Sequence, residues 1–264
     1  MPSLAGIVIS FTVLGVVFYA VEHWFASIPQ QPIRRSGFTV DAIYWAFTPL
    51  VTKTLAKFTT FAGVAVVAVL LGRKLGPELA NGFGPIAEQP VGLVVIEMLV
   101  LGDFIGYWTH RIFHRGWLWR FHAIHHSSTQ LDWLSAVRVH PVNDVLSRLV
   151  QVCILMLLGF PLTALAAYVP FLTLYAILLH ANVGWDYGPL RRVIASPRFH
   201  RWHHTSQAQG QDKNFAGLLP LWDQLFGTYY MPAGRQPEVF GVCDGPVPQT
   251  FLAQLAYPFE KSRR

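Results

Sequence analysis

Charged side chains are scarce in this 264-residue chain. Aspartate, glutamate, lysine and arginine make up 13% of the residues, whereas soluble globular domains carry about 25%. Apolar residues make up 53%, and the mean hydropathy is +0.38. This composition excludes an intrinsically disordered chain. It also disfavours an ordinary soluble enzyme, because too few charges are present to cover a water-facing surface.

Cysteine and acidic residues are also few. Cys153 and Cys243 are too few for a zinc ribbon or a small disulfide scaffold, so we expect free thiols. The chain has 14 acidic and 20 basic residues, which leaves a formal charge of +6. The basic residues do not form runs, and this disfavours nucleic acid as a partner. They indicate cationic loops that face an anionic membrane leaflet.

Two long apolar runs lie in the first third of the chain. Residues 4–20 hold no charge and predict one membrane span of roughly 20 residues. A signal peptide fits this run less well, because no lysine or arginine precedes it and no small-residue cleavage site follows before Pro29. Residues 41–72 predict a second helix, tilted or started at the interface, whose early half carries Lys53 and Lys57.

Two further apolar runs follow. Residues 91–109 predict a third span that contains Glu97 and Asp103, and each acid is either a functional residue or a hydrogen-bonded helix contact. Residues 145–180 are too short for two full spans, which need about 40 residues. They predict a short helical hairpin that turns at 159–161 and either crosses thinly or is re-entrant.

Basic residues set the predicted orientation. Arg111 and Arg120 follow the third run, and Arg191 and Arg201 follow the hairpin. Since a hairpin returns the chain to the side that it left, both groups share one face, which we predict to be cytoplasmic, with the N-terminus outside. The predicted fold is therefore all-α: an integral, multi-pass membrane helical bundle with a cytoplasmic histidine-rich metal-binding cap, in one structural domain.

Histidines are concentrated in the second half of the chain. Ten of the eleven lie between His110 and His204. His110 and His114 are four residues apart, and the pattern H-x-x-H-H occurs twice, at 122–126 and at 200–204. On a helix these spacings place the imidazoles on one face. At this histidine content the pattern would arise about 0.02 times by chance, so a functional cluster is the better interpretation.

This abundance of imidazole predicts a metal centre. Neutral imidazole binds iron, zinc, copper and nickel, and eight or nine rings suit two ions side by side better than one. The H-E-x-x-H motif of zinc hydrolases and the Glu-x-x-His signature of soluble di-iron proteins are both missing. We favour a dinuclear iron site held by histidines. The alternatives are a non-catalytic membrane protein that binds or transports metal and a metal-dependent membrane lipid hydrolase.

Short motifs around the histidines resemble the fatty acid hydroxylase and sterol desaturase superfamily. The resemblance covers roughly residues 95–230. The motifs are DxxxYxxHRxxH (103–114), LWRFHxxHH (118–126), RVHP (138–141), HAN (180–182), GPL (188–190), PxxHRxHH (197–204) and WDxxFGTY (222–229). The resemblance implies a membrane-bound enzyme of lipid metabolism with two iron ions, dioxygen as co-substrate and supplied electrons, which hydroxylates or desaturates lipid C–H bonds. It also implies N-terminal transmembrane helices and a loop in 1–90, a fatty acid hydroxylase-like catalytic domain in 91–230 and a C-terminal tail in 231–264.

The resemblance also implies a set of metal ligands. These are His110, His114, His122, His125, His126, His180, His200, His203 and His204. His180 depends mainly on the resemblance, because a lone histidine on an apolar hairpin is more often a buried core residue. Gly184 stands where some members carry a further histidine, which leaves one iron with an open or water-filled position. For His140 we expect a structural role or a role in orienting a ligand, and not metal ligation, and for His23 an interfacial position.

Two acids lie close to the histidine motifs. Asp103, His110 and His114 lie on one helical stripe. Ligating imidazoles usually donate their other N–H to a carboxylate or carbonyl. We therefore expect Asp103 to orient a ligand or hold a proton beside the site, with a helix-packing hydrogen bond as the alternative. Asp223 either supports the site in the same way or caps a helix.

The predicted substrate is a lipid that enters from the bilayer between the third span and the hairpin. Fatty acyl, sterol, sphingolipid, ether lipid and carotenoid-like substrates all fit, as do both hydroxylation and desaturation. Electrons must come from a separate ferredoxin or cytochrome with its reductase, because G-x-G-x-x-G and C-x-x-C-H motifs are both missing. Cationic loops, with Arg115, Arg191, Arg192 and Arg201 among their residues, either dock an acidic donor or simply face the anionic leaflet.

Overall fold

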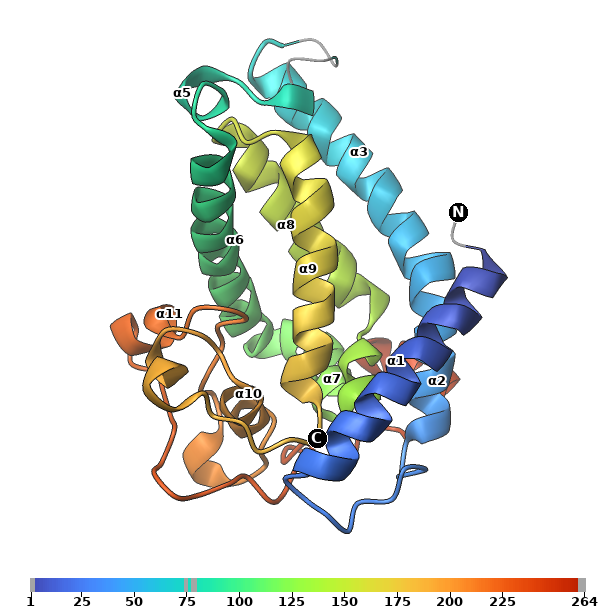
Figure 1. Ribbon diagram of the computed structural model, residues 1–264. Helices are drawn as coiled ribbons and strands as arrows, with labels where there is room; N and C mark the ends of the chain where they lie inside the picture. The colour runs from blue at the N-terminus through green and yellow to red at the C-terminus, as the bar shows by residue number, and fades with distance from the viewer. Residues whose placement is uncertain (1–2, 74–75, 77–79, 261–264) are drawn as a thin grey trace.

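The computed structural model describes residues 3–73, 76 and 80–260, which form a helical protein (Figure 1). No strand occurs among these residues; isolated β-bridges pair Ala26 with Val183 and Thr205 with Phe240. Positions 74–75 and 77–79 of the predicted N-terminal part, and the last four positions of the predicted tail, lie outside the described residues. The architecture confirms the predicted all-α class.

The body of the molecule consists of α1 (Leu4–Phe25), α2 (Phe38–Phe47), α3 (Lys53–Leu70), α6 (Val91–Phe113), α8 (Pro141–Leu157) and α9 (Leu162–His180). Shorter helices are α5 (Gly84–Ala87), α7 (Trp119–His126), α10 (Pro197–His203), α11 (Leu221–Leu225) and α12 (Phe251–Ala256). The π-helical turn η1 (Thr48–Thr52) joins α2 to α3, and 3-10 turns are η2 (Gly116–Leu118), η3 (Trp133–Val137), η4 (Gly188–Arg192), η5 (Ala208–Gly210) and η6 (Tyr257–Phe259).

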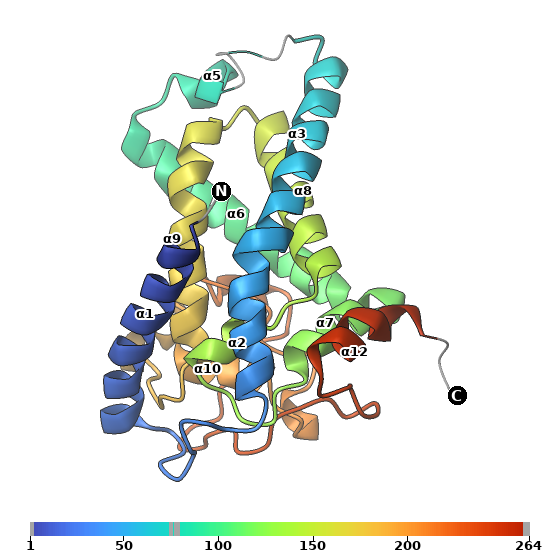
Figure 2. The same cartoon turned by 90° about the vertical axis from the view of Figure 1, so that its right-hand side faces the viewer.

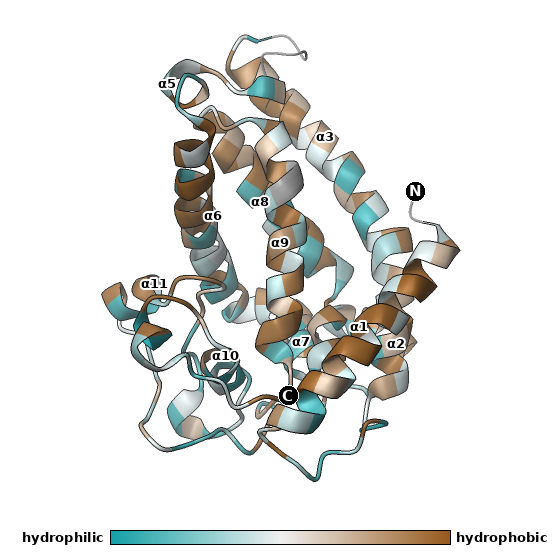
Figure 3. Ribbon diagram, viewed as in Figure 1, coloured by the Kyte–Doolittle hydropathy of each residue, from teal (hydrophilic) through white to brown (hydrophobic). Residues whose placement is uncertain are grey.

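Four helical segments in the described part of the chain are long and apolar enough to cross a membrane. They are Leu4–Phe25, Phe38–Leu70, Val91–Phe113 and Leu162–His180. The second segment continues from α2 through η1 into α3, and η1 forms where Pro49 supplies no N–H to the helical ladder. Apolar side chains such as Phe58 and Val69 point outward, 71% and 79% exposed. Figure 3 shows the hydrophobic colouring of these helices.

The predicted hairpin is present as α8 and α9, and it turns at the predicted place. Gly159 has φ of +94°. A Cβ atom there would lie 2.3 Å from the carbonyl oxygen of Phe83. The turn therefore needs glycine both for its backbone conformation and for its contact with the preceding loop.

The helices pack against one another along most of their length. Val94 and Met98 of α6 share a core with Leu155 of α8 and Leu165 of α9, and α3 lies beside α8 (Figure 2). At one end of this bundle, the turn of the hairpin lies near α5. At the other end, α7, α10 and α11 form a cap (Figure 1). The cap carries most of the histidines.

Candidate metal centre

Four helices bring the histidines together. His110 lies in the last turn of α6, and His180 is the last residue of α9. Each H-x-x-H-H pattern falls on a short helix of the cap, α7 or α10, as the spacing predicts. The start of α10 is fixed locally, because the Ser196 side chain accepts a hydrogen bond from the Phe199 N–H and Pro197 opens the first turn.

The nine predicted histidines form two adjacent groups. The five-histidine group comprises His110, His114, His122, His126 and His203, and the four-histidine group comprises His125, His180, His200 and His204. Within each group, one ring nitrogen from every histidine lies within 4.8 Å of the others. The rings of His126 and His204 stack at 4.3 Å between centroids, so the groups touch. The arrangement could hold two metal ions side by side.

In four of the rings, hydrogen bonds of the outer ring nitrogen, the one that does not face the other histidines, fix the tautomer. Nδ1 donates to a backbone carbonyl in four rings: His110 to Phe215 (2.8 Å), His125 to Arg138 (3.1 Å), His180 to Ala176 (2.7 Å) and His203 to Lys213 (2.7 Å). Because a carbonyl oxygen can only accept, Nδ1 must carry the proton. In each of these neutral rings the lone pair therefore lies on Nε2, which points into the shared space.

The inner ring nitrogens face one another without a proton between them. Nε2 of His125 lies 3.1 Å from Nε2 of His180, although both rings carry their proton on Nδ1. Two lone pairs at this distance repel, and a cation between them converts the contact into coordination. In the five-histidine group, the buried Nε2 atoms of His114 and His203 have no hydrogen-bond partner among the described residues. The donor set therefore fits metal ions.

The protonation state of the cap histidines agrees with metal binding. Burial lowers the pKa of six of them well below the usual range, and neighbouring imidazoles lower it further: His122, His125, His126, His200, His203 and His204. The pKa of His114 is also lowered by burial. These rings are neutral near pH 7, which is the form that coordinates a metal.

Two side chains that the sequence did not point to hold outer ring nitrogens. The Asn143 side-chain oxygen accepts from Nδ1 of His122 at 2.8 Å, and the Asp212 carboxylate accepts from Nδ1 of His114 at 3.1 Å. Asp212 has φ of +54°, a conformation that aspartate and asparagine tolerate better than most residues. Asp212 lies eight residues after the last histidine motif, so its place in the sequence could have marked it as a candidate. Nothing in the sequence marked Asn143 in this way.

Asp103 acts on the histidines through a loop. Its carboxylate accepts hydrogen bonds from the N–H groups of Gly217, Leu218 and Leu219 at 2.8–3.1 Å. No hydrogen bond joins Asp103 to a histidine within the described residues. The loop that Asp103 holds includes Phe215, whose carbonyl fixes His110. The expected orienting role is therefore indirect.

Asp223 holds the same loop and does not cap a helix. Its carboxylate accepts from the N–H groups of Phe215 and Ala216 and from the Thr228 hydroxyl. The helix that contains it, α11, begins at Leu221 and has no side-chain cap. Of the two expected roles, capping is wrong, because the buried carboxylate satisfies loop N–H groups that have no helical partner.

The remaining histidines lie outside both groups. His140 caps α8 through the Val142 N–H, and its other nitrogen donates to the Leu255 carbonyl, which confirms a structural role. His23 is exposed on α1. At Gly184, an added Cβ would lie 2.9 Å from the Gln236 side chain. No tenth histidine joins the nine in the described structure.

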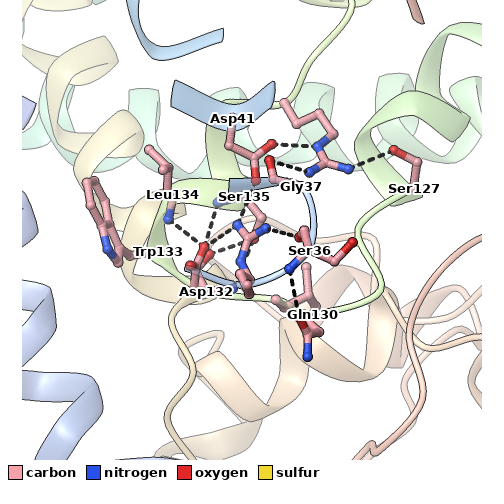
Figure 4. A network of polar contacts seen from close by, with 12 residues as sticks. Ser36, Gly37, Asp41, Ser127, Gln130, Asp132, Trp133, Leu134 and Ser135 are labelled. Atoms are coloured by element: carbon pink, nitrogen blue, oxygen red, sulfur yellow. Dashed lines mark hydrogen bonds and ion pairs between the residues drawn. The ribbon is translucent and has the colours of Figure 1, made fainter. Parts of the chain in front are cut away.

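A buried ionic network positions the residue that fixes His125. The Asp41 carboxylate pairs with Arg138 at 2.5 Å and with Arg35 at 2.6 Å, and Arg35 also pairs with Asp132 (Figure 4). The side chains of Asp41 and both arginines are at most 1% exposed. Since the Arg138 carbonyl accepts from His125, the start of the second span is tied to the four-histidine group.

A cavity of about 620 Å³ reaches the histidines from the side of the bundle. Its wall includes His110, His122, His125, His180 and His200. Gly106 and Thr109 of α6 form part of this wall, as do Gln151 of α8 and Thr173 of α9, so the cavity lies between α6 and the hairpin, where we expected the substrate. It also extends towards α1 and η1, where Ile7 and other residues complete the wall. Its volume is typical of ligand pockets, about 300–1,000 Å³.

A second cavity of about 380 Å³ lies against other members of the five-histidine group. His114, His126 and His203 contribute to its wall, together with Asp212 and Asp244. The histidine layer therefore lies between an apolar cavity within the bundle and a polar cavity on the cap.

Comparison with known proteins places the histidine region in a family. The family model for fatty acid hydroxylases matches residues 95–228. The chain is 35% identical over 178 residues to ornithine lipid hydroxylase OlsE of Rhizobium tropici, which covers 67% of this chain and 54% of that protein. No solved structure matches the chain.

More distant relatives match a smaller part of their own length. The chain is 32% identical over 141 residues to alkylglycerol monooxygenase of Homo sapiens, covering 53% of this chain and 31% of that protein. It is 27% identical over 158 residues to very-long-chain aldehyde decarbonylase GL1-6 of Oryza sativa subsp. japonica, covering 52% and 23%. The chain thus spans about half the length of the first relative and less than a third of these two.

Proposed function

The chain belongs to the fatty acid hydroxylase family, as the sequence motifs predicted, and from this membership we propose that it is a multi-pass membrane oxygenase. It hydroxylates or desaturates a C–H bond of a lipid with iron, dioxygen and electrons from a separate donor. The observation that carries the proposal is the convergence of inner ring nitrogens, whose lone pairs face one another without protons between them.

Two iron ions are proposed, one in each histidine group. The five-histidine group would hold one ion, and the four-histidine group would hold the other. When bound, this pair of ions supplies the activation of dioxygen. Six of the nine rings bond through Nδ1 to a backbone carbonyl, Asn143 or Asp212, and such a bond fixes the orientation of a ring and raises its basicity as a ligand.

The chain's own residues position the lipid and exclude water. The cavity brings apolar side chains such as Leu14, Leu172 and Ile177 to the same space as His125 and His180. An acyl or alkyl segment in this space would lie beside the inner ring nitrogens. Fixing the reacting carbon in this way removes much of the entropic barrier to reaction.

Electrons are proposed to arrive at the cap from a separate ferredoxin or cytochrome with its reductase. Arg115 and Arg192 are exposed on the histidine side of the molecule, and Arg191 is half-buried. Arg201 is fully buried, so the expectation that it docks a donor was wrong. Exposed arginines such as Arg115 and Arg192 attract an acidic protein partner and speed its association. Membrane topology predicts that this side faces the cytoplasm.

Lipid profiling tests the proposed activity. Cells that express the chain should contain a lipid about 16 mass units heavier or about 2 lighter than its precursor, the change for adding oxygen or losing two hydrogens. The change should require air, and purified protein should contain about two iron ions per chain. Zinc alone, with lipid hydrolysis in the absence of air, would instead support a hydrolase. Bound metal without any lipid change would support a metal-binding or transport protein.

A further inference from the structure

Charged side chains line the apolar cavity at a distance from the histidines. Lys53 lies at the start of α3, and Asp144 and Arg148 lie on α8; all three form part of the cavity wall. Ser147 and Gln151 add polar groups on the same face of α8. Ionisable side chains are costly in membrane-spanning segments, and Lys53 lies in one of the four segments long enough to span, so its presence on a cavity wall points to a function.

The three charges do not cancel. Asp144 pairs with Arg148 at 2.8 Å in an i, i+4 arrangement, and both side chains stay partly exposed, 19% and 27%. Lys53 is exposed and forms no ion pair or hydrogen bond with the described residues. Two cations and one carboxylate leave this part of the wall with one excess positive charge.

The charged side chains of α8 lie at a defined distance from the histidines, measured along the helix. Asn143 contacts His122 directly, and Arg148 follows Asn143 by five residues on α8. Five residues of α-helix rise about 7–8 Å. A ligand could therefore place one group at Lys53 and Arg148 while a carbon a few bonds away lies against the inner ring nitrogens.

We propose that the cavity binds a lipid whose headgroup carries an anionic group, a carboxylate or a phosphate, which pairs with Lys53 and Arg148. The inference rests on the proposed oxygenase function for the statement that this lipid is the substrate. It names the substrate class: an ionic lipid oxidised at a carbon close to its headgroup. A neutral sterol or carotenoid would offer no anionic group to Lys53 or Arg148.

Binding in the absence of turnover tests this inference. The metal-loaded protein in phosphatidylcholine nanodiscs, without dioxygen or reductant, is equilibrated with N-palmitoylglycine or its uncharged methyl ester. A second pair, dipalmitoyl phosphatidic acid and dipalmitoylglycerol, tests phosphate in place of carboxylate. Bound lipid is counted by native mass spectrometry. We expect the anionic member of at least one pair to bind about tenfold more tightly than its neutral partner, as for one charge-assisted hydrogen bond.

Substitutions assign this preference to the cavity. Lys53→Met and Arg148→Met should each reduce it to about twofold or less. Lys57→Met is the matched control, because Lys57 is also exposed, lies one turn further along α3 and does not line the cavity. Equal binding of charged and neutral lipids, or the same loss in Lys57→Met, would overturn the inference. If the preference depends on Lys53 but no oxidised lipid is found in cells, only the oxygenase function fails.

Discussion

The five-histidine group and the four-histidine group are held by different parts of the chain. In the first, the outer ring nitrogens of His110, His114 and His203 bond to the 212–215 loop. In the second, those of His125 and His180 bond to backbone carbonyls at η3 and within α9. Three members of the five-histidine group thus depend on a loop that buried carboxylates hold in place, whereas a fourth, His122, bonds to Asn143 of α8. The four-histidine group depends on helices and the buried ionic network.

The difference suggests that the two proposed metal positions have different rigidity. The acceptor for His180 is the Ala176 carbonyl within α9, and the acceptor for His125 is the carbonyl of Arg138, whose side chain forms a buried ion pair. Neither acceptor can move without disturbing that helix or that ion pair. The 212–215 loop adopts positive φ angles at Asp212 and Asn214 and depends on Asp103 and Asp223 for its shape. We expect the five-histidine group to be the more easily perturbed of the two.

The largest expected effect comes from removing one inner ligand from each group. His125→Ala and His122→Ala should each lower the iron content to about one ion per chain, and each should reduce lipid oxidation more than about 100-fold, beyond the loss typical of residues that only orient a ligand. Both proteins should stay in the membrane. Metal analysis and lipid profiling measure these effects.

His23→Ala is the matched control for these two variants, because His23 is exposed and belongs to neither group. Its iron content and activity should equal those of the unchanged protein. Full activity of His125→Ala would count decisively against the assignment of this group as a metal site.

An intermediate effect should follow from weakening the ionic network. Asp41→Asn leaves the buried Arg138 guanidinium without a carboxylate and Arg35 with Asp132 alone, and breaking such a buried pair costs about 3–5 kcal/mol of unfolding free energy. Because Arg138 fixes His125, iron should be lost first from the four-histidine group. Thermal unfolding and a chelator titration measure the two effects.

Asp144→Asn makes the same chemical change in an exposed ion pair. It should alter the unfolding free energy by less than about 1 kcal/mol. If Asp41→Asn lost iron equally from both groups, the separate support of the four-histidine group would be disproved.

The smallest expected effect concerns the loop. Asp212→Ala removes the acceptor of the His114 Nδ1 proton, but Asp212 is 48% exposed and water can replace it. Iron affinity of the five-histidine group should fall about tenfold, at the lower end for lost orienting contacts. Competition with a chelator measures this.

Asp244→Ala is the control for Asp212→Ala, because Asp244 lines the same polar cavity without a hydrogen bond to a histidine in the described structure. It should leave iron affinity unchanged. A similar decrease in both variants would show that the general charge of this cavity, and not the bond to His114, sets the affinity.

Local spacing in the sequence predicted much of the centre. The H-x-x-H-H patterns fix which imidazoles share a helix face, and the apolar runs fix which helices are long enough to cross a membrane. These features depend only on residues within one or two helical turns. The turn at Gly159 was predictable for the same reason.

Contacts between distant segments were not predictable. The pairing of Asp41 with Arg138 joins residues 97 positions apart, and the bond from the Leu219 N–H to Asp103 spans 116. Nothing in the local spacing of Asp103 distinguishes a bond to an imidazole from a bond to a loop. The extension of the cavity towards α1 and η1 depends on how these two elements pack, and hydrophobic periodicity does not encode this.

Because the histidine layer lies between two cavities, the proposed lipid and the proposed electron donor would approach it from opposite sides. Under the proposed function, a lipid would reach one side of the imidazoles through the apolar cavity, and a water-soluble reductant would approach the opposite side at the polar cavity of the cap. The lipid and the electron donor would therefore not compete for one entrance to the site. The two supply routes can therefore be altered independently, one by changing the helices and the other by changing the cap.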